Sequence, residues 1–84
     1  EVDEDHALQL YSLIYNNTRN SSEQRTKALF NFGDIALRKG NRESAVTAYA
    51  KIINGDADSI AVSEAKQRIS RIHENMENLQ TENP

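Results

Sequence analysis

The 84-residue sequence contains no cysteine, no tryptophan and only one proline. The lack of cysteine excludes structural disulfides, zinc–thiolate sites and cysteine nucleophiles. No apolar run approaches the roughly 18–20 residues that a membrane-spanning helix needs. We therefore predict a chain with no membrane span, whose stability rests on packing alone.

The sequence also lacks a marked excess of charge. Ten basic and thirteen acidic residues are interleaved along the chain, and the net charge is −3. Nucleic-acid binding usually requires a basic stripe, so no nucleic-acid partner is predicted. The chain opens on Glu1 rather than Met and has no signal peptide. We expect a processed chain or a piece of a longer protein, and the compartment stays open between cytoplasm and bacterial envelope.

No catalytic motif stands out. His6 and His73 belong to no HxxxH or HExxH spacing, and there is neither a P-loop nor a Gly-x-Gly-x-x-Gly run. The acidic residues Asp3, Glu4 and Asp5 suit the start of a helix better than a buried catalytic pair. We therefore expect no enzyme activity, no cofactor and no metal site.

Four stretches with apolar residues three and four apart predict an all-α fold in a single domain, residues 1–84. The predicted helices cover about 3–16, 22–39, 42–54 and 59–79, and residues 80–84 are predicted to be a disordered tail. Ser21 with Gln24 forms a capping-box pattern. Gly40, after two basic residues, is a typical helix stop, and Asn41 can cap the next helix.

The same spacing predicts which residues are buried. These are Ala7, Leu10, Tyr11 and Ile14, then Leu29, Phe32 and Ala36, then Ala45, Ala48, Tyr49, Ile52 and Ile53, and finally Val62, Ala65, Ile69, Ile72, Met76 and Leu79. Gly33 lies within a helix, where glycine costs about 1 kcal/mol against alanine. We expect a neighbouring helix to approach it closely, with Ala45 and Ala48 facing it.

The fourth helix is predicted to be longer than the third, and its apolar seam continues to its end. We therefore expect Ile72, Met76 and Leu79 to pack against a second copy of the chain, giving a homodimer, or against a segment outside this sequence. The alternative is that the helix bends back over the first helix or frays.

The chain contains an internal repeat. Residues 7–16 match residues 45–54 at an offset of 38, with Ala, Tyr, Ile and Asn coinciding. Ser22, Ala28 and Phe32 fall on Ser59, Ala65 and Ile69 at an offset of 37. A repeated two-helix unit is typical of an α-solenoid.

The middle hairpin, from Ala28 to Ala57, resembles a tetratricopeptide repeat. The residues at the positions that define the family pattern are Leu29, Phe32, Gly33, Gly40, Ala45, Tyr49 and Ile52. The chain departs from the family pattern at Ala36, where Tyr is usual, at Ile52, where a small residue is usual, and in lacking the terminal Pro. The run Asp56–Ser59, followed by Ala61, Ala65 and Ile69, resembles a divergent branch found in bacterial envelope proteins tied to the Tol–Pal and β-barrel assembly systems.

The resemblance implies a right-handed stack of antiparallel helical hairpins that binds another protein or a peptide as an adaptor or scaffold. It implies a concave face formed by the first helix of each hairpin. The expected partner-binding residues are Lys27, Phe30, Asn31, Asp34, Arg38, Glu64, Gln67 and Arg71, with Phe30 as an exposed aromatic. Some relatives clamp a terminal carboxylate with paired Lys and Asn; Asp34 takes the Asn position here and would repel it.

Three readings of function remain at this point. The first is the protein-interaction module. The second is a structural segment, either the capping end of a longer solenoid or a self-association module built on the fourth helix. The third is an envelope assembly factor associated with lipid or peptidoglycan.

Overall fold

The computed structural model describes the backbone of residues 3–81 and the side chains of residues 3–75. This part of the chain is all-α. Its four helices are α1 (Glu4–Asn16), α2 (Ser22–Arg38), α3 (Arg42–Asn54) and α4 (Ser59–Thr81). The predicted boundaries agree to within two residues. The predicted tail is wrong at Gln80 and Thr81, which continue α4, and residues 82–84 lie outside the described residues.

The helix ends follow from local side-chain chemistry. The Ser21 hydroxyl accepts the Gln24 backbone N–H at 3.1 Å, and the Gln24 side chain accepts the Ser21 N–H at 3.1 Å, which confirms the capping box. The Asn41 and Asp58 side chains accept backbone N–H groups three residues on, at the starts of α3 and α4. These caps satisfy donors that the first turn of a helix leaves unpaired.

The α2–α3 turn depends on Gly40, whose φ is +87°. The Gly40 N–H donates to the Leu37 carbonyl at 2.9 Å, and the Asn41 N–H donates to the Ala36 carbonyl at 2.8 Å. This pair of bonds is the Schellman motif, which needs a left-handed residue at this place. The predicted helix stop is confirmed.

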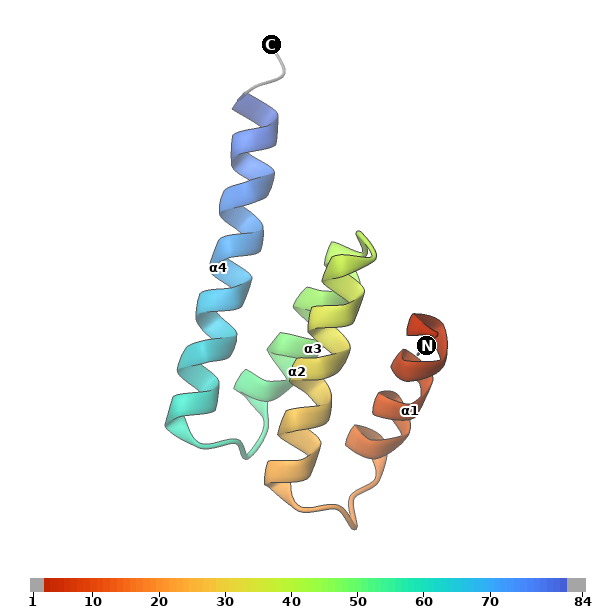
Figure 1. Cartoon of the computed structure of the whole chain (residues 1–84). Helices are drawn as coiled ribbons and strands as arrows, with labels where there is room; N and C mark the ends of the chain where they lie inside the picture. Colours follow the sequence, from red (N-terminus) through yellow and green to blue (C-terminus); the bar gives the residue numbers. More distant parts are fainter. Residues whose placement is uncertain (1–2, 82–84) are drawn as a thin grey trace.

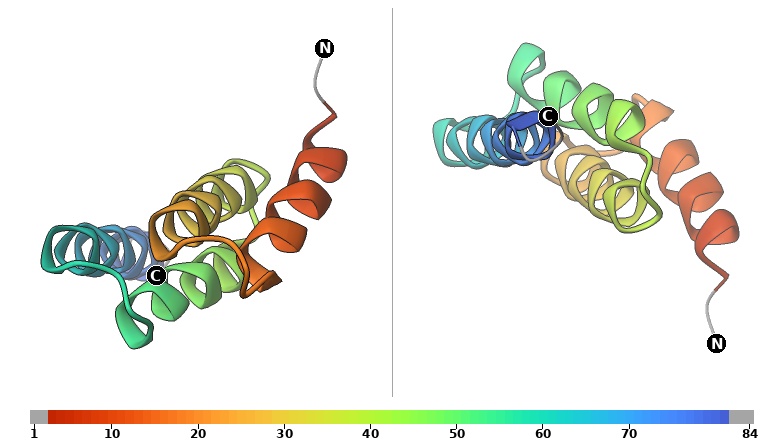
Figure 2. Two further views of the ribbon diagram at one scale, coloured as in Figure 1. Left: turned by 90° about the horizontal axis from the view of Figure 1, so that it is seen from below. Right: turned by 90° about the horizontal axis from the view of Figure 1, so that it is seen from above.

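The helices form a flat, elongated array with extents of 49 × 33 × 16 Å. Each helix packs against the next along the chain in an antiparallel hairpin, with α1 and α4 at opposite ends (Figure 1). Viewed from below and above, α2 and α4 lie side by side and α3 lies in the angle between them (Figure 2). The C-terminal turns of α4 extend past the other helices, so the alternative that α4 bends back over α1 is wrong.

The core lies where α2, α3 and α4 meet. Its buried residues are Leu29, Ala36, Ala45, Ala48, Tyr49, Ile52, Ala65 and Ile72. Tyr49 and Ile52 are its largest fully buried side chains. The predicted core positions on these three helices fall in or against this cluster wherever their side chains are described, with the exception of Val62, which is half-buried outside it.

The predicted buried face of α1 is wrong in two places. Leu10 is 47% exposed and Ile14 is 37% exposed, whereas Leu8 and Tyr15 pack against the core. Helix α1 has apolar residues on two of its sides, so their spacing could not show which side is buried. Among the described residues, α1 packs chiefly on α2. Only one of its two apolar sides is therefore covered.

Gly33 is a point of close helix contact, as predicted, but the residue opposite is different. A Cβ atom at Gly33 would lie 2.5 Å from Cε1 of Tyr49, which is far inside van der Waals contact. The ring of Tyr49, rather than Ala45 or Ala48, therefore occupies the space that the missing side chain leaves. This contact fixes Tyr49 at the centre of the α2–α3–α4 junction.

A candidate binding groove between α2 and α4

An open groove of about 610 Å³ separates the N-terminal halves of α2 and α4. Its walls come from α2 and α4 and its closed end from the α3–α4 loop. The lining residues are Ser22, Glu23, Thr26, Lys27, Phe30, Asp56, Ala57, Asp58, Ile60, Ala61 and Glu64. Its volume lies in the range of protein ligand sites.

Four of the lining residues are apolar, namely Phe30, Ala57, Ile60 and Ala61. Ile60, in the first turn of α4, is 81% exposed and is the most exposed large apolar residue of the described chain. Phe30, which lines the groove from α2, is partly buried against the core. The prediction that Phe30 is an exposed aromatic is therefore wrong, since the residue is only partly exposed. It borders the groove while its ring also packs inward, with its centroid 6.3 Å from that of Tyr49.

The groove leads to a polar cluster that joins three helices. Asp34 of α2 accepts a hydrogen bond from the Tyr49 hydroxyl at 2.5 Å and forms an ion pair with Arg68 of α4. The guanidinium carbon of Arg68 lies 5.0 Å from the centre of the Phe30 ring, and the Arg68 Nε donates to Glu64 at 3.1 Å. A planar guanidinium can make both kinds of contact at once, which an ammonium cannot.

The electrostatics of this cluster favour a neutral tyrosine and a charged arginine. Burial, and then the hydrogen bond to the Asp34 carboxylate, raise the pKa of the Tyr49 hydroxyl to about 12. The Asp34 carboxylate has two strong donors, Tyr49 and Arg68, so its charge is neutralised within the chain. It is thus a structural group that holds α4 against α2 and α3.

The structure gathers part of the predicted partner-binding stripe. Lys27, Phe30 and Glu64 line the groove, and Asp34 is joined to Glu64 through Arg68, which pairs with both. The other predicted residues lie elsewhere. Asn31 faces the α1 side of α2, Arg38 pairs with Glu4 of α1 at 2.8 Å, and Gln67 and Arg71 share another face of α4.

Sequence reasoning missed Ile60 and Arg68. The 37-residue offset matches Asp34 to Arg71, but Arg68, one turn earlier, makes the contact. The Glu64–Arg68 spacing of four is a signal that could have indicated it. Ile60 lies outside the apolar seam of α4, and this position in the sequence could have indicated that its side chain is not part of the core.

The predicted self-association residues divide into two groups. Ile72 is 2% exposed and belongs to the core of the single chain, so the expectation that it packs against a second copy or an outside segment is wrong. The side chains of Met76 and Leu79 lie outside the described residues. The homodimer through α4 therefore stays a prediction for those two positions alone.

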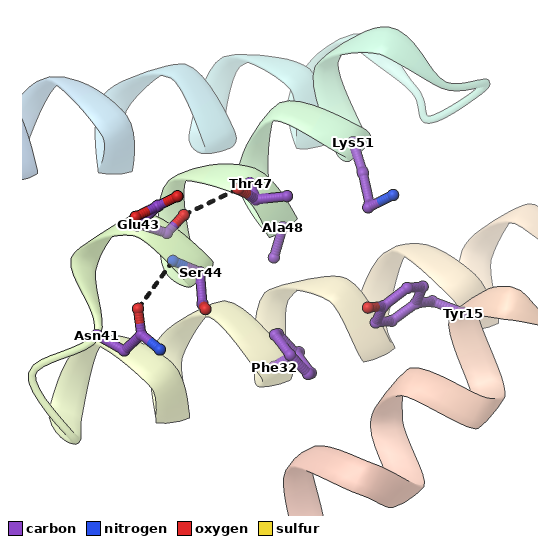
Figure 3. Close-up of a pocket in the computed structure, with 8 residues that line it drawn as sticks. All are labelled: Tyr15, Phe32, Asn41, Glu43, Ser44, Thr47, Ala48 and Lys51. Atoms are coloured by element: carbon purple, nitrogen blue, oxygen red, sulfur yellow. Dashed lines mark hydrogen bonds between the residues drawn. The ribbon is translucent and has the colours of Figure 1, made fainter.

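A second, smaller concavity of about 410 Å³ lies between α3 and the α1–α2 pair. Its lining residues are Tyr15, Phe32, Asn41, Glu43, Ser44, Thr47, Ala48 and Lys51 (Figure 3). Tyr15 and Phe32 meet edge to face at 5.6 Å. The Asn41 side chain caps α3 and the Thr47 hydroxyl donates to the Glu43 carbonyl, so these polar groups are already paired.

Between residues 3 and 81, no helix combines the length and the apolar character needed to cross a bilayer. Among the side chains that the structure describes, no three His, Cys, Asp or Glu residues lie close enough together to hold a metal ion.

Comparison with models of known protein families, with curated proteins and with solved structures finds no match to this chain.

Proposed function

We propose that this chain is a protein-interaction module of the tetratricopeptide type, which binds a peptide segment of another protein in the groove between α2 and α4. The observation that carries the proposal is Ile60, which is 81% exposed and lines a groove of about 610 Å³ together with Phe30. Burying an isoleucine is worth roughly 1.5–3 kcal/mol, so such a residue is a natural anchor for a ligand.

Three features support the repeat assignment. Gly33 meets the Tyr49 ring within one hairpin, Gly40 closes the turn between its helices, and α2 and α4 run side by side as the first helices of successive hairpins would. The Asp34–Tyr49–Arg68 cluster then sets the spacing of α2 and α4, and with it the width of the groove. A rigid groove binds with a smaller loss of conformational entropy than a mobile one.

The test is selection of a displayed library of random dodecapeptides against the chain, followed by affinity measurement on resynthesised binders. Ile60→Ser should weaken these peptides about tenfold, since it removes a large apolar contact. Leu13→Ser is the matched control, because Leu13 is 65% exposed on α1, away from the groove. Binders that tolerate Ile60→Ser, or a selection that yields none, would contradict the proposal.

A second candidate is the structural segment of a longer helical array. Leu10 and Leu13 form an exposed apolar strip on α1, at 47% and 65% exposure. In an array another helix would cover this strip. Light scattering tests this second candidate. The parent protein should self-associate as its concentration rises, whereas the double variant Leu10→Glu/Leu13→Glu should not. A monomeric parent at high concentration removes this candidate.

A further inference from the structure

We infer that a second concavity, between α1 and α2, receives an amphipathic helix from outside residues 1–84, which packs antiparallel to α1 as α2 packs on α3. The inference comes from the internal repeat of the chain. It concerns a different surface from the groove between α2 and α4 and does not depend on the peptide proposed to bind there.

The pair α1 and α2 repeats the pair α3 and α4. In the sequence, α1 corresponds to α3 at an offset of 38 residues and α2 to α4 at an offset of 37. The structure agrees: Asp3 caps α1 where Asn41 caps α3, and Ala28 and Ala65 are both buried. The α3–α4 loop is one residue shorter than the α1–α2 loop, which accounts for the change of offset. Each residue of α1 and α2 thus has a counterpart in α3 or α4.

These counterparts differ in how far they are covered. Tyr49 and Ile52 of α3 are 0% and 1% exposed, because α3 lies in the angle between α2 and α4. Their counterparts on α1 are Tyr11, which is half-buried, and Ile14, which is 37% exposed. Helix α2 packs on α1 as α4 packs on α3, but within residues 3–81 no helix takes beside α1 the place that α2 takes beside α3.

The concavity lies at this place and has a volume of about 280 Å³. Its lining residues include Tyr11 and Ile14 from α1, and Lys27, Ala28 and Asn31 from α2. Their counterparts, in the same order, are Tyr49, Ile52, Glu64, Ala65 and Arg68. The surface between α1 and α2 therefore repeats a surface that the chain itself covers elsewhere.

Helix α2 is what covers the repeated surface on α3 and α4. Its Gly33 lies under the Tyr49 ring, and its Asp34 accepts a hydrogen bond from the Tyr49 hydroxyl at 2.5 Å and pairs with Arg68. The Phe30 ring lies 5.0 Å from the Arg68 guanidinium carbon. A helix that packs on α1 and α2 as α2 packs on α3 and α4 would enter the concavity.

The same register sets the chemistry of the incoming helix. We expect glycine or alanine opposite Tyr11, because a Cβ at Gly33 would lie 2.5 Å from the Tyr49 ring. The next residue takes the place of Asp34 and should be an acceptor, within reach of the Tyr11 hydroxyl and the Asn31 amide. Apolar residues four before and three after the small residue complete its buried side.

Helix α4 of a second copy does not offer such a side. The buried residues of α2 with this spacing are Leu29, Gly33 and Ala36. Their counterparts on α4 are exposed and polar, namely Lys66, Ser70 and His73. Burying unpaired polar and charged groups costs free energy, so α4 suits the solvated end of a helix stack and α1 the end that accepts a further helix.

The experiment supplies the helix in the same chain. A copy of residues 22–40 is joined directly to Asp3, in place of Glu1 and Val2, so that the copied Gly40 forms the turn and Asp3 takes the capping place of Asn41. By circular dichroism the melting temperature should rise at least about 5 °C above that of the parent. Amide hydrogen exchange in α1 should slow about tenfold, because α1 gains a second neighbour.

The matched control is the same fusion with Gly33→Leu in the added copy alone. Leucine there would collide with the Tyr11 ring, so both gains should be lost while the parent fold is untouched. Tyr11→Ser should lower the melting temperature more in the fusion than in the parent. Tyr15→Ser should lower it equally in both, since Tyr15 already packs on Phe32.

Two results would overturn the inference: equal melting temperatures of the fusion and its leucine control, or an equal effect of Tyr11→Ser in the fusion and the parent. Either result leaves the proposed peptide groove between α2 and α4 intact, because Tyr11 does not line it.

Discussion

At the scale of single residues, the contact between Gly33 and Tyr49 organises the junction of three helices. Tyr49 is fully buried, its ring lies over Gly33, and its hydroxyl is held by Asp34. Neither end of the ring can move without breaking another contact. One glycine and one tyrosine therefore set how closely α2 and α3 approach.

Gly33→Ala should destabilise the protein despite the better helix propensity of alanine. The new Cβ would lie 2.5 Å from the Tyr49 ring, and overpacking costs about 1–3 kcal/mol against a propensity gain of about 1 kcal/mol. Denaturant unfolding measures the difference. In a Tyr49→Leu background the same substitution should become neutral or stabilising; an unchanged effect there would rule out the ring as its cause.

The ionisation of Tyr49 provides a second test at this scale. Its pKa is raised from 10.0 to about 12, so the neutral hydroxyl is favoured in the folded state. The stability from this group is complete below pH 10 and is lost as the pH rises towards 12. Ultraviolet titration of tyrosinate should show a step near pH 12 that Tyr49→Phe lacks. A Tyr49-dependent step near pH 10 would mean that the hydroxyl is not buried as described.

At the scale of helices and turns, each end is determined by a few neighbouring residues. The capping box at Ser21, the Asn41 and Asp58 caps and the Schellman turn at Gly40 all act within about six residues of the chain. This is why the helix boundaries could be predicted from the sequence. The rotation of α1 could not, because that helix has apolar residues on two sides.

Gly40→Ala should lower the free energy of unfolding by about 1–2 kcal/mol. No atom lies within 4 Å of the position that a Cβ would take, so the effect should come from the left-handed backbone alone. Gly40→Asn is the matched control and should cost less, since asparagine tolerates this conformation better. Thermal melts of both variants decide it; an alanine variant as stable as the parent would contradict the turn geometry.

At the scale of the whole molecule, α4 serves both the core and the groove. Its inner side contributes Ala65 and Ile72 to the core, while Ile60 and Glu64 line the groove. Arg68 joins these two roles because it pairs with both Asp34 and the groove residue Glu64. The groove and the fold therefore depend on the same docking of α4 against α2 and α3.

The same substitution at two positions on α4 should have very different effects on stability. Ile72→Asp buries a carboxylate at a position 2% exposed and should cost more than about 3 kcal/mol, a large part of the stability of a small domain. Ile60→Asp, at a position 81% exposed, should change the stability little. Circular dichroism melts compare the two. Equal stability of both variants would mean that α4 does not dock as described.

By itself, the sequence determined the all-α class, the four helices and most of the core on α2, α3 and α4, because caps, turns and apolar spacing act over short distances. Lys27, Phe30 and Glu64, which it predicted as partner-binding residues, line the groove, and their role in binding stays a prediction. Only the tertiary structure decided that Tyr49 meets Gly33, that Arg68 rather than Arg71 reaches Asp34, and that Ile60 stands exposed at the groove that Phe30 also lines. Contacts between helices depend on their relative rotation and translation, and the packing of all the side chains together sets these.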